Sequence, residues 1–403
     1  MDKANNARGL KAIPRSIWAL GFVSLFMDTS SELIHSLLPT FLTVTLGASV
    51  LSLGLIEGAA EATAAITKIF SGTLSDYLGK RKILTLIGYG LAAVTKPLFP
   101  LASSIGLVFA ARFLDRIGKG IRGAPRDALI GDLAPPHLRG ACYGLRQALD
   151  TVGAVAGPLL AMAFMVILSG NIRAVFWVAV IPAAICIAIL IFAVREPEAA
   201  QETKQPRSPI CWADVKNMGW PFWGLVAIAL ILMLGRMSEA FLLLKAQNVG
   251  NSLALIPLVL VLYNIVYALT AYPAGALSDI MKRSQLLAFG ILLFVAGDIT
   301  LALAKSDLGV ALGVVLWGLH MGFCGSLLSA MVADAAPPAL RGTAFGLLNL
   351  VSGIGLLAAS ALAGLLWDRF GPEAAFMASA AFAALALLAL LFTQIETPSI
   401  KNT

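Results

Sequence analysis

The first long apolar stretch of the chain contains three ionisable residues, Asp28, Glu32 and His35, which lie four and then three positions apart. On a helix this spacing places the three side chains on one face. Two carboxyl groups and an imidazole can carry protons or bind a cation. Charges inside a membrane-spanning helix cost on the order of 2.5–3.5 kcal/mol on insertion scales, so they mark functional cavities by default. We therefore expect this row to face a water-filled cavity and to take part in proton coupling or substrate binding.

Other apolar stretches also contain ionisable residues at helical spacing, most of them in the N-terminal half. Each carboxylate among them either lines the same cavity or only neutralises a basic neighbour. These further candidates are Glu57 and Glu61, Arg112, Arg146 with Asp150 at i,i+4, and Arg236 with Glu239 at i,i+3.

Arg112 is expected near the middle of its helix, at a depth similar to that of Asp28. A lone buried guanidinium is costly and needs a carboxylate partner. The partner is either Asp28 or an anionic group of the substrate, and we favour the substrate.

The composition indicates the class of protein that these helices belong to. The 403 residues are 59% hydrophobic and only 13% charged, with a mean hydropathy of +0.87. Soluble domains carry about 25% charged residues, so the chain is expected to be a polytopic membrane protein. The net charge of +7 is better explained by basic cytoplasmic loops than by nucleic acid. The four cysteines are scattered without CxxC spacing, which argues against a zinc site or a disulfide framework.

A bilayer core needs roughly 20 apolar residues per helix, and twelve such runs are visible. They fall near 17–45, 51–73, 83–102, 105–123, 140–168, 173–194, 220–246, 253–276, 284–304, 308–333, 341–367 and 373–393. A polar linker divides them six and six. The expected organisation is an N-terminal bundle at 1–195, a cytoplasmic linker at 196–219 and a C-terminal bundle with a short tail at 220–403.

Lysine and arginine residues are concentrated on one side of these spans. They precede the first span, follow the second, fourth and eighth, and fill the central linker, whereas the opposite loops contain few. The positive-inside rule therefore predicts that both termini are cytoplasmic, in a multi-pass protein of the cytoplasmic (inner) membrane.

Two sequence motifs occur once in each half. "DLAPPHLRGACYGL" begins at Asp132 and "DAAPPALRGTAFGL" at Asp334, an offset of 202 residues. "GTLSDYLGKRK" contains Asp76 and "GALSDIMKRSQ" contains Asp279, an offset of 203 residues. Two motif pairs at nearly one offset indicate duplication, which is typical of transporters that move two bundles about a site near the bilayer midplane.

On these motifs the sequence resembles the major facilitator superfamily over essentially its whole length. "GTLSDYLGKRK" matches the motif of that family between its second and third spans at Gly72, Asp76, Gly79, Lys80 and Arg81. The resemblance implies an all-α integral membrane fold of twelve transmembrane helices in two pseudo-symmetric six-helix bundles. It also implies a secondary active transporter that works by alternating access.

The resemblance suggests a cytoplasmic gate around this motif. Asp76, at a helix end, can accept charge-assisted hydrogen bonds that hold such a gate closed. Asp115 and Arg116 are expected near the cytoplasmic end of the fourth span, where they would join Asp76. Asp279 occupies the equivalent place in the second copy, although Met281 stands near the position where the motif has a glycine.

The fifth span contains "GAVAGP", which resembles the core of the antiporter motif of the family at Gly153, Gly157 and Pro158. Two glycines one turn apart and a proline allow a kinked, closely packed helix. The glycine pair that follows in the family is missing, because Leu160 and Ala161 stand there. The resemblance favours proton-coupled export of a small organic solute by antiport, in the manner of drug–proton antiporters.

The main alternative within transport is a divalent metal transporter that uses Asp28, Glu32, His35 and His320, with oxygen and nitrogen ligands. A non-transporting membrane receptor is a remote alternative, since no added signalling domain is visible. An intramembrane enzyme is not expected, because neither GxSxG nor HExxH occurs, and no cofactor is expected. The expected partners are a small-molecule substrate, protons and the lipid bilayer, with the protein as a monomer.

Overall fold

The computed structural model describes residues 13–78, 80–135, 138–195, 218–277, 281–335 and 341–393. Every regular element in these ranges is helical. The helices of the first half are α1 (Arg15–His35), α2 (Leu38–Thr40), the π-helical turn η2 (Phe41–Thr45), α3 (Val50–Leu78), α4 (Arg81–Thr95), α5 (Leu98–Leu101), α6 (Ile105–Leu133), α7 (Arg139–Ile167), α8 (Ile172–Val178) and α9 (Val180–Phe192). Those of the second half are α11 (Trp220–Gly235), α12 (Ala240–Val249), α13 (Leu258–Leu277), α14 (Arg283–Leu303), α15 (Asp307–Ala335), α16 (Arg341–Phe370) and α17 (Pro372–Phe392).

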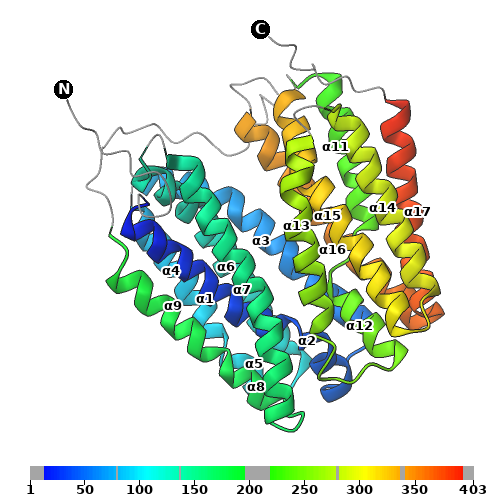
Figure 1. Ribbon diagram of the computed structural model, residues 1–403, viewed down its shortest axis with the longest axis horizontal. Helices are drawn as coiled ribbons and strands as arrows, with labels where there is room; N and C mark the ends of the chain where they lie inside the picture. Colours follow the sequence, from blue (N-terminus) through cyan, green and yellow to red (C-terminus); the bar gives the residue numbers. More distant parts are fainter. Residues whose placement is uncertain are drawn as a thin grey trace.

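The helices form two groups that follow the two halves of the sequence (Figure 1). The first group, coloured blue to green, contains α1 to α9, and the second, coloured green to red, contains α11 to α17. Within the first group α1 packs on α7 and α9, while α6 packs on α3 and α4. Within the second, α14 packs on α15 and α17. Most of the predicted linker, residues 196–217, lies outside the described residues.

Ten helical segments of the described chain are long and apolar enough to cross a membrane. Two further helices occupy the fourth and eighth predicted spans. The 29-residue α6 contains many charges, and the apolar part of α13 is short, at Leu258–Ala271. The all-helical membrane fold is therefore confirmed, and twelve spans remains the prediction.

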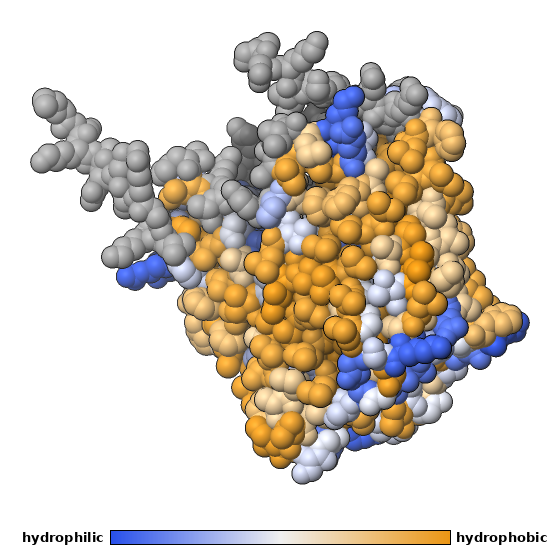
Figure 2. All heavy atoms as spheres, turned by 45° about the vertical axis from the view of Figure 1, so that its right-hand side comes forward, coloured by the Kyte–Doolittle hydropathy of each residue, from blue (hydrophilic) through white to orange (hydrophobic). Residues whose placement is uncertain are grey.

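The outer surface of the second group is predominantly apolar. Figure 2 shows a broad hydrophobic face with hydrophilic residues gathered toward its ends. Large apolar side chains of α14 and α17 are exposed, including Phe289, Leu292, Leu385, Leu388 and Leu391. A soluble protein rarely exposes so much contiguous apolar surface, and a lipid environment accounts for it.

The first span of each half is interrupted, which the sequence analysis did not predict. The first span bends after His35, where α1 ends before the short α2. The seventh span was expected to be continuous from 220 to 246, but α11 ends at Gly235, and Arg236 has an extended backbone before α12 begins at Ala240. Such interruptions free backbone carbonyls and are tolerated at membrane depth only inside protein or beside a cavity.

Contacts between the two groups involve α3 with α16, α7 with α13, and α2 with α12. The carboxylate of Asp368, near the end of α16, accepts hydrogen bonds from the backbone N–H groups of Val50 (3.0 Å) and Leu51 (2.8 Å), at the start of α3. Thr40 of α2 donates to Gln247 of α12 at 3.1 Å. In Figure 1, α2 and α12 lie at the end of the molecule opposite the two chain termini. The two groups are thus joined by specific polar contacts at that end.

Candidate functional site

Arg112 of α6 forms a two-pronged ion pair with Glu57 of α3. Its Nε donates to Glu57 Oε1 at 3.1 Å and its Nη2 to Oε2 at 2.8 Å. The side chains are only 2% and 0% exposed. The two parallel hydrogen bonds neutralise both buried charges. Either charge buried alone would be strongly destabilising. We had expected Arg112 to meet either Asp28 or the substrate; the structure gives it Glu57 instead, because α6 packs against α3.

His35 bridges this pair to Glu32. Its Nδ1 lies 3.4 Å from Glu32 Oε2, and its Nε2 lies 3.4 Å from Glu57 Oε2, although without hydrogen-bond geometry. His35 lies in the last turn of α1, where its imidazole reaches Glu57 of α3. Glu32 is partly exposed and forms the accessible end of this chain of groups. Two residues of the predicted row, Glu32 and His35, therefore do lie together.

A second set of charges continues along α6. Lys96, just after α4, donates to Asp115 Oδ1 at 2.8 Å and to the hydroxyl of Ser31 at 2.9 Å. Arg116 lies 3.3 Å from Glu61 and 4.0 Å from Asp115. Lys96 was missed by the sequence analysis, although a single lysine in an apolar run is itself a sign that a carboxylate lies nearby.

These contacts correct the expected position of Asp115 and Arg116. We had placed them near the cytoplasmic end of the fourth span, but α6 continues to Leu133, so both lie well inside it. Their partners are Lys96 and Glu61. The α6 charges therefore belong to the buried network of α1, α3 and α6.

Asp28, the first residue of the predicted row, has a different partner from the rest of the row. Its carboxyl group lies beside that of Asp150 on α7. Asp150 also pairs with Arg146, whose Nη2 lies 3.0 Å from Oδ2, as the i,i+4 spacing predicted. Both carboxyl groups are partly accessible. Two neighbouring carboxylates repel each other, and a proton on one of them removes the repulsion.

The antiporter-motif glycines explain why α7 comes so close to α1. A Cβ added at Gly153 would lie 2.5 Å from the carbonyl oxygen of Leu25 and 3.1 Å from Asp28 Cβ. One added at Gly157 would lie 2.8 Å from Glu32 Cβ. Pro158 follows inside α7. The two glycines thus allow the backbone of α7 to pack directly against the part of α1 that carries Asp28 and Glu32.

The C-terminal half contributes a smaller polar group at the interruption between α11 and α12. Arg236 lies 3.5 Å from Glu239, which confirms the predicted pair, and the hydroxyl of Tyr263 on α13 donates to Glu239 at 3.4 Å. Arg236 also interacts electrostatically with Glu61 of α3. Arg236, Glu239 and Glu61 are all partly exposed. The C-terminal half therefore has its own group of polar side chains at the break between α11 and α12.

The predicted gating motif lies where α3 ends and α4 begins. Gly72 faces Ala124 of α6, and Lys80 is exposed. Arg81 pairs with Asp132, at 2.6 Å, and so connects the two repeated motifs of the first half. Gly79 and Asp279 lie outside the described residues, as does the side chain of Asp76. A gating role for Asp76 remains a prediction.

The residues of the metal alternative are not brought together. His320 packs on α14, where its Nδ1 lies 2.9 Å from the carbonyl oxygen of Gly290, whereas Glu32 and His35 belong to the first bundle. Within the described ranges no group of three histidine, cysteine, aspartate or glutamate residues is arranged to hold a metal ion.

Comparison with known proteins decides the family. The model of the Major Facilitator Superfamily matches residues 20–244 and again residues 228–403. The chain belongs to the major facilitator superfamily. This transporter is 32% identical, over 95% of its own length and 96% of the relative, to an uncharacterised transporter of the same superfamily from Methanocaldococcus jannaschii.

Two further proteins are similar to this chain, one in its overall fold and one in the sequence of a 144-residue region. The fold of this superfamily member is similar to the crystal structure of the peptide transporter POT, with a TM-score of 0.80 at 14% identity, covering 98% of this chain and 97% of the other. The quinolone resistance protein NorA of Staphylococcus aureus is 28% identical over 144 residues, 36% of this chain and 37% of NorA. The match to the superfamily and to its full-length relative makes the protein a multi-pass membrane transporter, not an enzyme.

Proposed function

We propose that this transporter exports a small organic solute across the cytoplasmic membrane in exchange for protons, by alternating access. The contact between Asp28 and Asp150 is the observation that carries the proposal. Two carboxyl groups in contact repel each other unless they share a proton. Once that proton leaves, Asp150 keeps Arg146 as a partner. The pair can therefore take up and release one proton.

The position of this pair supports coupling to transport. Asp28 lies on α1, a helix that bends after His35, and Asp150 lies on α7, which packs on α1 through Gly153 and Gly157. A change in the separation of α1 and α7 alters the contact between the two carboxyl groups. Proton binding and helix movement are thus linked through one interface, as alternating access requires.

The proposed direction of transport rests on two weaker observations. The Gly153, Gly157 and Pro158 motif resembles that of antiporters, and NorA, a relative over about a third of the chain, is named for quinolone resistance. We infer that the solute binds between the bundles, near the partly exposed pairs Glu61–Arg116 of the first half and Arg236–Glu239 of the second. Both charge signs are present there, which suits an organic solute that carries polar or ionic groups.

The orientation and assembly are part of the same proposal. The Lys/Arg bias of the loops favours an orientation with both termini in the cytoplasm. We further propose that the protein lies in the inner membrane and acts as a monomer. In this orientation the polar contacts of Asp368 and Thr40 lie at the outer end. The conformation described here would then be closed toward the outside.

A two-stage experiment tests the proposal. A thermal-shift screen of quinolones and metabolites on the purified protein first finds a ligand, because a molecule that binds the folded state raises its apparent stability. Uptake of that ligand is then measured in proteoliposomes with an acidic or an alkaline lumen. Antiport predicts accumulation only when the lumen is acidic, since protons then leave as solute enters. Accumulation only with an alkaline lumen indicates symport, and uptake indifferent to the gradient excludes proton coupling.

A further inference from the structure

Asp298 lies in the middle of the C-terminal bundle, far along the sequence from the charges already described. In the sequence it is near one end of the ninth predicted span (284–304), yet its side chain is 0% exposed. Trp317 of α15 donates its indole N–H to Oδ1 at 2.8 Å. The other carboxylate oxygen contacts the hydroxyl of Ser379 on α17. Asp298 is thus enclosed by α14, α15 and α17.

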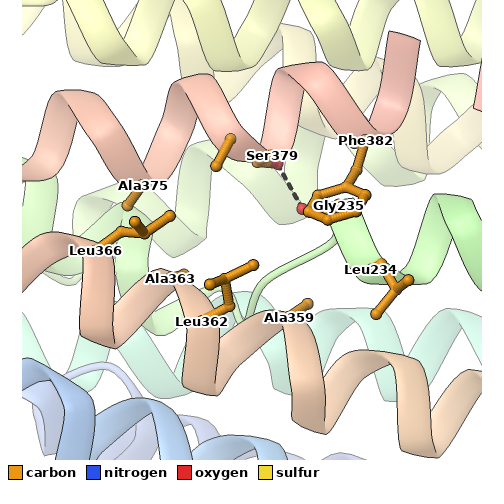
Figure 3. A pocket seen from close by; sticks show the side chains of 10 residues that line it. Leu234, Gly235, Ala359, Leu362, Ala363, Leu366, Ala375, Ser379 and Phe382 are labelled. Carbon is orange, nitrogen blue, oxygen red and sulfur yellow. Dashed lines mark hydrogen bonds between the residues drawn. The ribbon is translucent and has the colours of Figure 1, made fainter. Parts of the chain in front are cut away.

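The same hydroxyl reaches the interruption of the seventh span. Ser379 Oγ contacts the carbonyl oxygen of Gly235, the last residue of α11 (Figure 3). Because the helix ends there, this carbonyl oxygen has no intrahelical hydrogen-bond donor. Three oxygens, from Asp298, Ser379 and Gly235, therefore lie in a row. Both contacts are too short to leave room for a metal ion between the oxygens.

The number of protons decides the state of this row. A serine hydroxyl has one proton to donate, but Ser379 Oγ contacts two oxygens that, with an ionised Asp298, are both acceptors. If Asp298 carries a proton, it donates to Ser379 Oγ, and Ser379 donates to Gly235. Every contact is then a hydrogen bond with one donor and one acceptor.

The surroundings of Asp298 do not supply a balancing positive charge. In the described part of the protein, the groups that act on this carboxyl are the hydrogen-bonding side chains of Ser379 and Trp317. The other ionisable side chains described on the packed elements and at the end of α11 are Arg283, Asp307, His320, Cys324, Glu373 and Arg236. Of these, His320 is bonded to Gly290 and Arg236 is paired with Glu239. A buried carboxylate without a cationic partner is costly, and a proton removes that cost.

A small cavity borders the end of α11. It lies between α11, α16 and α17 and is lined by residues that include Leu234, Gly235, Ala359, Ser379 and Phe382 (Figure 3). Apart from Ser379, the lining residues are apolar. The cavity has room for about one water molecule, so release of the carbonyl permits a small local adjustment of the end of α11.

We propose that Asp298 is a proton-binding site that holds the end of α11 in place through Ser379. With the proton bound, the row Asp298–Ser379–Gly235 is complete and the interruption at 236–239 is fixed. When the proton leaves, Ser379 turns its hydrogen to the carboxylate and releases the carbonyl of Gly235. The mobility of the segment that carries Arg236 and Glu239 therefore follows the protonation of Asp298. This inference depends on neither the direction nor the coupling of transport.

The first test is infrared spectroscopy of the reconstituted protein at neutral pH. The spectrum of the parent minus that of Asp298→Asn should show the C=O band of one protonated carboxylic acid. Asparagine keeps the hydrogen bonds, because its amide donates to Ser379 and accepts from Trp317, so the variant is expected to fold. A difference spectrum with ionised-carboxylate bands instead overturns the proposal.

The second test is amide hydrogen exchange of peptides that span 236–239, from about pH 5 to about pH 9, where buried carboxyl groups titrate. The parent is compared with Asp298→Asn at each pH, which cancels the intrinsic pH dependence of exchange. The ratio of rates should be near one at low pH and rise about fivefold at high pH, as for the loss of one net hydrogen bond. A ratio that stays constant overturns the proposal. Ser379→Ala should exchange rapidly at every pH; slow, parent-like exchange in that variant also overturns it.

Discussion

The guanidinium of Arg112 in α6 donates two hydrogen bonds, of 3.1 and 2.8 Å, to the carboxylate of Glu57 in α3. The pair joins two helices of one bundle, and His35 of α1 touches the same carboxylate at 3.4 Å. Neither charge reaches solvent. Each can be buried only because the opposite charge lies next to it. This relationship makes Arg112 a structural residue of the bundle.

Arg112→Gln should therefore destabilise the protein by about 3–5 kcal/mol, because it leaves Glu57 buried without its main partner. Adding Glu57→Gln should recover much of that loss, since two neutral amides can hydrogen-bond in place of the ion pair. Thermal unfolding of the purified variants measures both effects. The matched control is Arg112→Gln with Asp28→Asn, which should recover nothing. Rescue by Asp28→Asn would show that Arg112 is paired with Asp28.

Gly157→Ala should destabilise the protein by about 1–3 kcal/mol, the usual result of overpacking. The new methyl group would lie 2.8 Å from the backbone nitrogen of Leu33 and from Glu32 Cβ, so α7 has to move away from α1. Gly144→Ala, in the same helix, is the control, because a Cβ added at Gly144 would have no contact within 4 Å. The control should be neutral or stabilised, as alanine favours helix. Equal unfolding temperatures for the two variants would contradict close α1–α7 packing at this glycine.

Asp368→Ala should loosen the contact between the bundles at the end opposite the termini. The carboxylate caps the start of α3 from α16, and loss of such a cap costs roughly 0.5–2 kcal/mol. Spin labels on the exposed residues Val44 and Ser252, after α2 and α12, would report the separation of the bundles. The variant should populate longer distances than the parent. An unchanged distance distribution would show that the cap does not hold the bundles together.

The sequence predicted the membrane class, the family and the approximate bounds of the helices, because apolar length and repeated motifs are local signals. The pairs Arg146–Asp150 and Arg236–Glu239 were predictable for the same reason, since each lies within four residues on the chain. Spacing along one helix is enough to bring such side chains together.

Partners on different helices were not predictable in this way. Glu57 for Arg112 and Lys96 for Asp115 depend on how helices rotate against each other, which the periodicity of one helix does not specify. The interruption of the seventh span at Arg236 was also missed. The segment contains no proline, and Arg236 and Glu239, three positions apart, are spaced as on one face of a continuous helix, so the sequence did not reveal the break.

We propose that Asp28 and Asp150 share the proton that drives transport. The most direct test is uptake of an identified ligand into proteoliposomes with an acidic lumen, for the parent, Asp28→Asn and Asp150→Asn, with the exposed Asp307→Asn as control. We predict that both pair variants lose gradient-driven accumulation, because an amide cannot exchange the proton, while counterflow of labelled for unlabelled ligand largely survives. Asp307→Asn should behave as the parent in both assays. Full gradient-driven accumulation in Asp28→Asn and Asp150→Asn would show that this pair does not carry the coupling proton.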